Sequence, residues 1–199
     1  MRPMGPITLP ARFRFTHDAG KGYRHYIEAT FFGIPVMKVN EHYLDGKGRL
    51  ELPFGVEEGQ KINQGGNLGM WAESSWFPSI YLTDPRVRWE PVDDVTALLV
   101  VPFGDQQERY VVRFDPDTGL ITWFESMRYH GETSRSKTLW LNQSVKWGTV
   151  DGPSPLGGRP FSTVGAAIWM DDGKPWAIFT VEDVVYNVDV KGYIRARGQ

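Results

Sequence analysis

The sequence predicts an all-β protein, a strongly bent antiparallel sheet or half-barrel covered by one helical lid. Most of the chain alternates apolar and polar residues in short runs separated by turn-forming residues, as half-buried strands do. Residues 67–82 are the exception, because their apolar side chains recur every four residues. The aromatic fraction of 14%, with eight tryptophans, suits cross-strand packing or an aromatic-lined cavity.

The first part of the chain contains three long strand patterns and a hairpin signal. RFRFTHD (12–18), RHYIEATFF (24–32) and VMKVNEHYL (36–44) each alternate with the period of a strand. The third run ends at Asp45 and Gly46, a dipeptide that favours a two-residue hairpin turn before RLELPF. These runs therefore predict consecutive antiparallel strands.

One helix is expected near the middle of the chain. The segment GVEEGQKINQGGNLG is polar and rich in glycine, which indicates a loop. Asn67 is a competent N-cap, and Ala72 and Trp76 follow it on one helical face. Pro78 disfavours helical geometry at the residue before it and permits a short second helix over SIYL. We therefore predict a helical insertion at about 67–82, packed on the concave face of the sheet or at its open end.

The strand pattern returns after the insertion and continues almost to the C-terminus. VTALLVVPF, ERYVVRFD and LITWFESMRYH are separated by turns and predict a meander. The chain as a whole then has roughly nine or ten antiparallel strands in sequential hairpins. The basic tail KGYIRARGQ is expected to fray. Because no repeat or linker interrupts the pattern, we predict a single β domain over residues 1–199.

Charge and composition exclude several classes of function. The formal charge of −2 includes no long run of either sign, which argues against a nucleic-acid partner. Without cysteine there is no disulfide, thiolate nucleophile or cysteine-ligated metal. The opening MRPMGPITLP lacks the apolar segment of a signal peptide or anchor, and no window reaches the apolar length of a membrane span. We expect a soluble, cytoplasmic protein, or a membrane-anchored or envelope protein if an N-terminal segment has been removed.

Four pieces between residues 46 and 129 occur in the order typical of an uncharacterised bacterial domain family. They are GKGRLELP, NLGMWAESSWFP, VRWEPVDD and FDPDTGLITWFESMRY. Over a bit under half its length the chain therefore resembles this domain of unknown function, which has no established activity. The resemblance implies a sheet-plus-helix layout similar to lipoprotein carriers of the LolA and LolB type. Members often carry a membrane-spanning N-terminus, which this sequence lacks.

The resemblance also marks individual positions. The matched polar residues are Glu73, Glu90, Asp93 and Arg128, and the matched apolar residues are Trp76, Pro78 and Trp89. Since a shared fold is a weak guide to function, these positions mark a region rather than a mechanism.

Glu73 and Arg128 are the leading polar candidates for a site. Glu73 lies one helical turn before Trp76, so its carboxylate is expected beside aromatic surface. If the helix covers the sheet, Glu73 can meet Arg128, whose strand face also carries His130. One hypothesis is a buried ion pair that fixes the orientation of the helix. The other is that Arg128 binds a carboxylate or phosphate of a ligand while Glu73 acts as a general base or orienter.

The histidines show no metal-binding spacing. They are His17, His25, His42 and His130, and none belongs to an HxH or HExxH motif. His25 and His42 fall on adjacent predicted strands, where either Glu28 or Glu41 could complete a two-histidine, one-carboxylate site, but the spacing gives no positive support. We therefore expect ordinary half-buried histidines, no metal and no cofactor.

The leading function is non-catalytic binding of a hydrophobic or amphipathic small molecule, lipid-like or an aromatic acid, in the concave face. The walls are expected from Trp76, Tyr81, Trp89 and Trp123, with Arg128 orienting the polar head.

Two alternatives stay open. The first is an enzyme on the same cup, an isomerase or hydrolase that uses Glu73 with Arg128 or His130. The second is a protein-interaction module with a filled core and an exposed sheet edge. The sequence predicts neither the ligand nor the oligomeric state.

Overall fold

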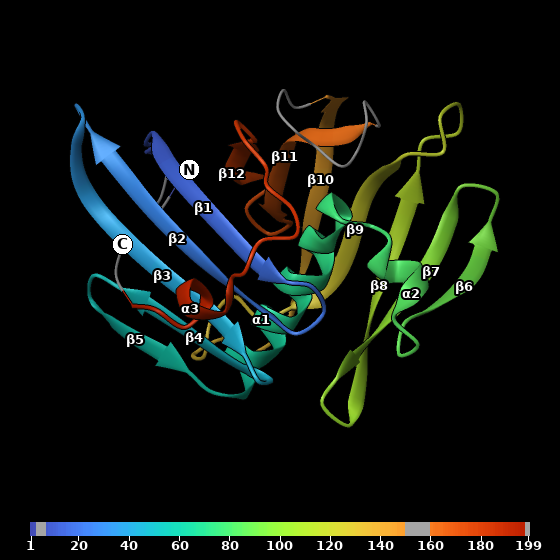
Figure 1. The fold of residues 1–199 in the computed structure, drawn as a ribbon, viewed down its shortest axis with the longest axis horizontal. Helices are drawn as coiled ribbons and strands as arrows, with labels where there is room; N and C mark the ends of the chain where they lie inside the picture. The colour runs from blue at the N-terminus through green and yellow to red at the C-terminus, as the bar shows by residue number, and fades with distance from the viewer. Residues whose placement is uncertain (3–6, 150–159, 198–199) are drawn as a thin grey trace.

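The structure, a computed structural model, describes residues 1–2, 7–149 and 160–197. It confirms the predicted class, all-β with a helical insertion. In the described residues twelve strands form two antiparallel sheets rather than one bent sheet, and one helix runs between them (Figure 1).

The first sheet contains the five N-terminal strands in sequence order. They are β1 Ala11–Asp18, β2 Gly22–Phe31, β3 Ile34–Leu44, β4 Lys47–Leu52 and β5 Gly55–Glu58. The expected turn at Asp45 and Gly46 closes the β3–β4 hairpin, and both residues have the positive φ that a two-residue turn of this kind requires.

The second sheet is a meander of the remaining seven strands. In chain order they are β6 Arg88–Asp93, β7 Thr96–Phe103, β8 Gln106–Phe114, β9 Ile121–Arg128, β10 Thr138–Gly148, β11 Phe161–Trp169 and β12 Lys174–Thr180. Because the helical insertion separates β5 from β6, the chain cannot pair these two strands as a hairpin. The outer edge strands β1 and β12 approach each other through Phe13 and Phe179, whose ring centroids lie 5.0 Å apart.

The insertion begins earlier than the sequence pattern predicted. Helix α1 spans Gln60–Glu73, and the single turn η1 (Ser74–Trp76) and the short helix α2 (Ile80–Thr83) follow it. The segment predicted as a glycine-rich loop is therefore mostly helix. Its glycines serve close packing, because a Cβ at Gly66 would lie 2.8 Å from the ring of Tyr43.

The core lies where α1 meets both sheets. Helix α1 contacts β3, β4 and β5 of the first sheet and β7 and β9 of the second. The cluster of buried side chains contains Tyr23, Tyr43, Leu68, Met70, Trp71, Ala72, Ile80, Tyr81, Leu99, Val101, Tyr110, Val112, Phe124 and Trp140. The space under the helix is therefore filled by side chains of the protein itself.

The described part of the tail, up to residue 197, returns to the first sheet instead of fraying, and residues 198–199 of the predicted tail lie outside the described residues. Helix α3 (Lys191–Ile194) packs against β1 and β2, and Ile194 is buried. The guanidinium carbon of Arg24 lies 4.3 Å from the centre of the Tyr193 ring, a cation–π contact that anchors this segment. No helix in the described part of the chain has the length and apolarity to span a bilayer.

Candidate functional site

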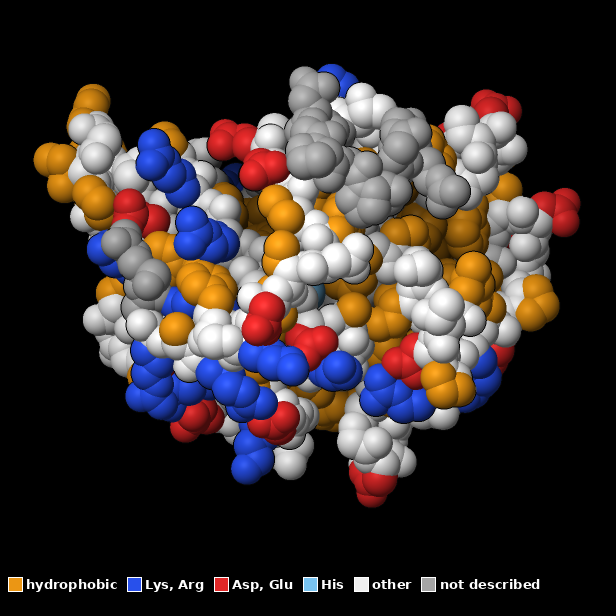
Figure 2. All heavy atoms as spheres, in the orientation of Figure 1, with side chains coloured by type: hydrophobic (Ala, Val, Ile, Leu, Met, Phe, Trp, Pro, Cys, Tyr) orange, Lys and Arg blue, Asp and Glu red, His pale blue; other side chains and the backbone are white. Residues whose placement is uncertain are grey.

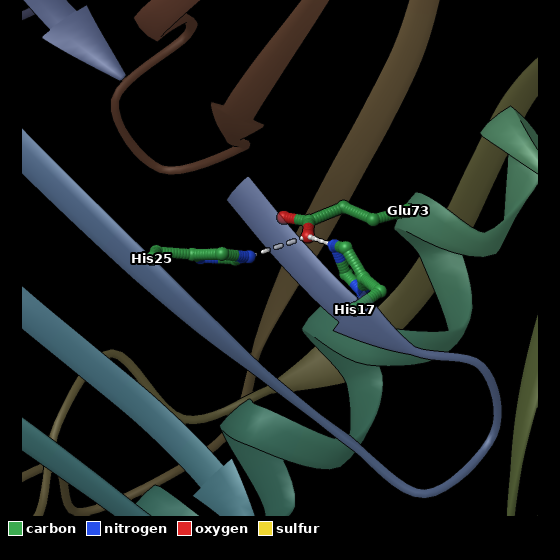
Figure 3. A group of neighbouring side chains, drawn as sticks. All are labelled: His17, His25 and Glu73. Atoms are coloured by element: carbon green, nitrogen blue, oxygen red, sulfur yellow. Dashed lines mark ion pairs between the residues drawn. The ribbon is translucent and has the colours of Figure 1, made fainter. Parts of the chain in front are cut away.

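Three ionisable side chains from three elements meet at one point between the sheets (Figure 3). His17 comes from β1, His25 from β2 and Glu73 from the last position of α1. The Oε2 atom of Glu73 lies 2.7 Å from Nε2 of His25 and 3.0 Å from Nε2 of His17. We call these three residues the His–Glu cluster.

The strand register explains why the two histidines share a face. In the β1–β2 hairpin His17 lies opposite Tyr23 and His25 lies opposite Phe15. His17 and Phe15 are two residues apart on one strand, so their side chains point to the same side of the sheet. The imidazole centroids are 5.6 Å apart, and α1 ends above them with Glu73.

The His–Glu cluster contains two oppositely charged groups, Glu73 and His25, although it is buried. Burial acts to raise the pKa of Glu73, but the charge of His25 and the close imidazole nitrogens of His17 and His25 prevail and lower it to about 2. Burial acts to lower the pKa of His25, but the carboxylates of Glu73 and Glu41 raise it to about 9. Burial dominates for His17, whose pKa is lowered. At neutral pH the cluster therefore holds an anionic Glu73, a cationic His25 and a neutral His17.

A second carboxylate stands on the far side of His25. Oε2 of Glu41 on β3 lies 3.7 Å from Nδ1 of His25, and the hydroxyl of Tyr23 donates a hydrogen bond to the other oxygen of Glu41. Burial acts to raise the pKa of Glu41, but His25, Arg128 and Tyr23 together lower it. His25 is thus held between two carboxylates, which fixes the orientation of its ring.

A large open groove runs beside the His–Glu cluster, with a volume of about 2280 Å³. It lies between β1, the η1–α2 segment, β12 and residues 181–190, and His17 is one of its lining residues. Its apolar walls include Phe13, Phe15, Trp76, Phe77, Ile178 and Phe179. Figure 2 shows this face hollowed in the middle, with apolar side chains in the hollow and charges of both signs around it.

A small cavity of about 20 Å³ lies beside the groove and is lined by Glu73. Ser75, Asn142 and Ser162 supply polar groups to its wall, and it shares Phe15, Trp76 and Phe179 with the groove. A space of this size and polarity has room for one water molecule. Of the cluster, His17 therefore lines the groove itself, and Glu73 lines the small cavity next to it.

The predicted aromatic wall divides into three different environments. Trp76 lines the groove, with its ring centroid 5.8 Å from that of Phe15. Tyr81 is buried in the core and its hydroxyl donates a 2.5 Å hydrogen bond to the carbonyl of Trp71. The indole of Trp89 packs against Tyr81 and donates to its carbonyl.

Trp123 lies on the opposite face of the second sheet from the core. Its strand neighbour Phe124 is almost fully buried in the core cluster, and successive side chains of a strand alternate between faces. Of the four aromatic residues expected in the wall, the groove is therefore lined by Trp76, whereas Tyr81 and Trp89 pack in the core.

The expected ion pair between Glu73 and Arg128 is not formed, because the two histidines occupy Glu73. The guanidinium of Arg128 instead lies 4.7 Å from the ring centre of Trp140 and 5.6 Å from that of Trp169. Helix α1 covers it closely, since a Cβ at Gly65 would lie 3.1 Å from Nε of Arg128.

The remaining sequence candidates lie away from the His–Glu cluster. The imidazole of His130 stacks on Trp169 at 3.7 Å between ring centroids and pairs with Asp171 at 3.2 Å. Glu90 pairs with Arg88 on the surface. Asp93 accepts a hydrogen bond from the backbone of Val95 in the β6–β7 turn, which is a structural role.

The sequence pattern missed the partnership of His17 and His25 with Glu73. The alternative site of His25 with His42, which the sequence did not favour, is not formed, because His25 lies opposite Glu41 while His42 lies opposite Arg24, on the other face of the sheet. A usable signal was present: the short turn after Asp18 fixes the register that brings the two histidines together.

The fold and this site define an all-β protein with a buried histidine–carboxylate cluster beside an aromatic groove. A family model described as a family of unknown function (DUF6544) matches residues 1–181. The chain belongs to this family. No curated protein and no solved structure matches the chain, so the likeness to LolA-type carriers stays a prediction.

Proposed function

We propose that this protein binds a hydrophobic or amphipathic small molecule in the groove between β1 and β12. The observation that supports this is the groove itself, whose walls are aromatic and aliphatic over several elements. Its volume exceeds the roughly 300–1,000 Å³ of ordinary ligand pockets, so it offers room for an extended molecule. The site lies beside the filled core and replaces the concave face under the helix as the place of binding.

The rim of the groove favours a ligand with a polar end. Arg12, Arg14 and Arg86 line it together with the carboxylates of Glu28 and Asp84. Because both signs of charge are present, the rim suits the polar head of an amphipathic molecule without selecting a purely anionic one. Arg128, the group expected to orient the head, is not among the lining residues.

Catalysis is a second candidate, favoured by the position of the His–Glu cluster. Glu73 adjoins a cavity with room for one water beside the groove, and two histidines stand in the place expected for Arg128 or His130. A carboxylate and imidazoles within hydrogen-bond range are the groups that general acid–base chemistry uses.

Native mass spectrometry of freshly purified protein, followed by organic extraction, tests for a ligand that copurifies. A matched pair of variants then tests the groove, with the amphipathic dye anilinonaphthalene sulfonate as probe. Trp76→Ala removes a groove wall and should weaken dye binding by about 10-fold, or about 1.4 kcal/mol. Trp123→Ala removes the same side chain from the outer face and should leave dye affinity unchanged. Equal affinities for the two variants would contradict binding in the groove.

A further inference from the structure

We propose that His17, His25 and Glu73 bind a divalent transition-metal ion next to the groove. The inference concerns the His–Glu cluster alone and does not depend on a small molecule in the groove. Two imidazole nitrogens and one carboxylate oxygen form a ligand set that suits Zn²⁺ or Fe²⁺, whereas Mg²⁺ and Ca²⁺ prefer oxygen ligands only.

The distances between the ligand atoms fit a shared ion. One ligand atom from each residue lies within 4.8 Å of the other two. Ligands about 2.0–2.2 Å from a tetrahedral metal stand roughly 3.3–3.6 Å from one another. The separations of 2.7 Å and 3.0 Å between Glu73 and the two histidines are shorter than this, and all three atoms lie within 4.8 Å of one another. An ion between them therefore requires Glu73 to move away from the histidines by less than about 1 Å.

The lack of hydrogen bonds at the same three atoms favours a bound metal ion over a purely hydrogen-bonded cluster. Nε2 of His17, Nε2 of His25 and Oε2 of Glu73 are all buried, and none makes a hydrogen bond of normal geometry within the described structure. Buried polar atoms are rarely left in this condition. A cation placed between the three atoms satisfies all of them at once, and its binding releases the Nε2 proton of the cationic His25 to solvent.

Glu41 and Tyr23 are arranged around His25 like the residues that orient a histidine ligand in a metal site. A histidine that binds a metal through one ring nitrogen usually presents the other to a carboxylate or carbonyl, which fixes its orientation and increases its basicity. Here Nδ1 of His25 faces the carboxylate of Glu41, and Tyr23 holds that carboxylate in place. The arrangement leaves Nε2 of His25 free to point toward Glu73.

The surroundings also leave a coordination position for a non-protein ligand. Three protein ligands around an ion that takes four leave one position open, as in catalytic zinc sites. The cavity of about 20 Å³ beside Glu73 has room for one water, with Asn142 and Ser162 in its wall. Because this cavity adjoins Glu73, one water would complete the coordination of an ion held there.

The test is a zinc titration of tag-free protein that has first been treated with a chelator. Competition against a chromophoric chelator gives the stoichiometry and the affinity, and we expect one Zn²⁺ per chain. His17→Asn and Glu73→Gln should each weaken binding by at least about 100-fold, because they remove direct ligands. His130→Asn is the matched control and should bind as the wild type does, since His130 pairs with Asp171 elsewhere.

Two further measurements keep the test decisive. Glu41→Gln keeps all three ligands but removes the charge behind His25, so we expect a loss of about 10–100-fold. If a ligand variant fails to fold by circular dichroism, cobalt binding to the wild type decides, because tetrahedral Co²⁺ with nitrogen and oxygen ligands absorbs intensely in the visible. Wild-type protein that takes up no ion, or takes it up as tightly after His17→Asn, would overturn the proposal.

Discussion

Glu73 is a carboxylate in a position that its own helix disfavours. It is the last residue of α1, where unpaired backbone carbonyls give the helix end a partial negative charge. Its side chain is only 13% exposed, so solvent screens little of this repulsion. The positive charge of His25 and the imidazole nitrogens of His17 and His25, 3.0 Å and 2.7 Å from Oε2 of Glu73, offset this repulsion. Contacts between elements, rather than helix propensity, therefore account for a glutamate at this position.

Glu73→Ala should lower the free energy of unfolding by about 3 kcal/mol, because it leaves buried His25 without its nearest counter-charge. Glu90→Ala is the control: Glu90 is 40% exposed and pairs with Arg88, and surface substitutions of this kind change stability by about 0.5 kcal/mol or less. Urea unfolding at neutral pH with a chelator present measures both, so that metal binding does not contribute. Losses of equal size would contradict the role assigned to Glu73.

The sequence identified Glu73 as a candidate but did not identify its partners. Hydrophobic periodicity places a residue on a face of its own element, and it does not encode where one element docks on another. Glu73 and His25 are far apart in the chain, so their contact depends on the path of α1 between the sheets. Arg128 was the expected partner if the helix covers the sheet, yet its guanidinium lies against Trp140 and Trp169.

At the scale of elements, the glycines of α1 decide how closely the helix approaches the sheets. A Cβ at Gly66 would lie 2.8 Å from the ring of Tyr43, whereas a Cβ at Gly69 would lie 3.4 Å from the hydroxyl of Tyr23, an ordinary contact. The sequence pattern treated these glycines as loop formers. Their role in packing becomes visible only with the facing side chains in place.

Alanine substitutions at these two glycines should have opposite signs. Gly66→Ala gains about 1 kcal/mol of helix propensity but creates a clash that costs about 1–3 kcal/mol, so we expect net destabilisation. Gly69→Ala gains the same propensity without the clash and should stabilise the protein by up to about 1 kcal/mol. Urea unfolding of both variants gives the signs directly. Stabilisation by both would show that α1 does not pack this closely on Tyr43.

The hairpins show how much local sequence can predict about the strands. Asp45 and Gly46 both have positive φ, and the aspartate–glycine signal located this turn correctly. Phe32 and Gly33 adopt the same pair of positive φ angles, although Phe32 is a residue that rarely does so. The β2–β3 turn was located by its glycine and proline only. The strands were therefore predictable from alternation. The type of turn was predictable only where the residues carry a known turn signal, as Asp45 and Gly46 do and Phe32 does not.

The whole molecule assembles its site from distant parts of the chain. The groove and its small cavity combine β1, the end of the helical insertion, β10, β11 and β12. The alternation of apolar and polar residues predicted these strands but not which strand edges face each other. The same alternation occurs in one bent sheet and in two separate sheets. The class of fold was therefore predictable, and the position of the groove was not.

Three buried tyrosines make the free energy of unfolding of the whole molecule depend on pH in the alkaline range. Tyr43 comes from the first sheet, Tyr81 from α2 and Tyr110 from the second sheet. Burial raises the pKa of Tyr43 to about 12 and raises the pKa values of Tyr81 and Tyr110 well above 10. The unfolded chain loses these protons near pH 10, so above that pH the native state binds more protons than the unfolded state.

It follows that the free energy of unfolding is unaffected by these groups below pH 10 and falls as the pH rises beyond it. Each tyrosine that stays protonated in the native state contributes a slope of about −1.4 kcal/mol per pH unit. Tyr110→Phe removes one such group, so its slope between pH 10 and 11, where the unfolded-state tyrosine is only partly ionised, should be shallower than that of the wild type by about 1 kcal/mol per pH unit. Urea unfolding at several alkaline pH values, with tyrosinate absorbance recorded in parallel, measures both slopes. Parallel slopes for the two proteins would mean that Tyr110 ionises in the native state and that the core between the sheets admits water.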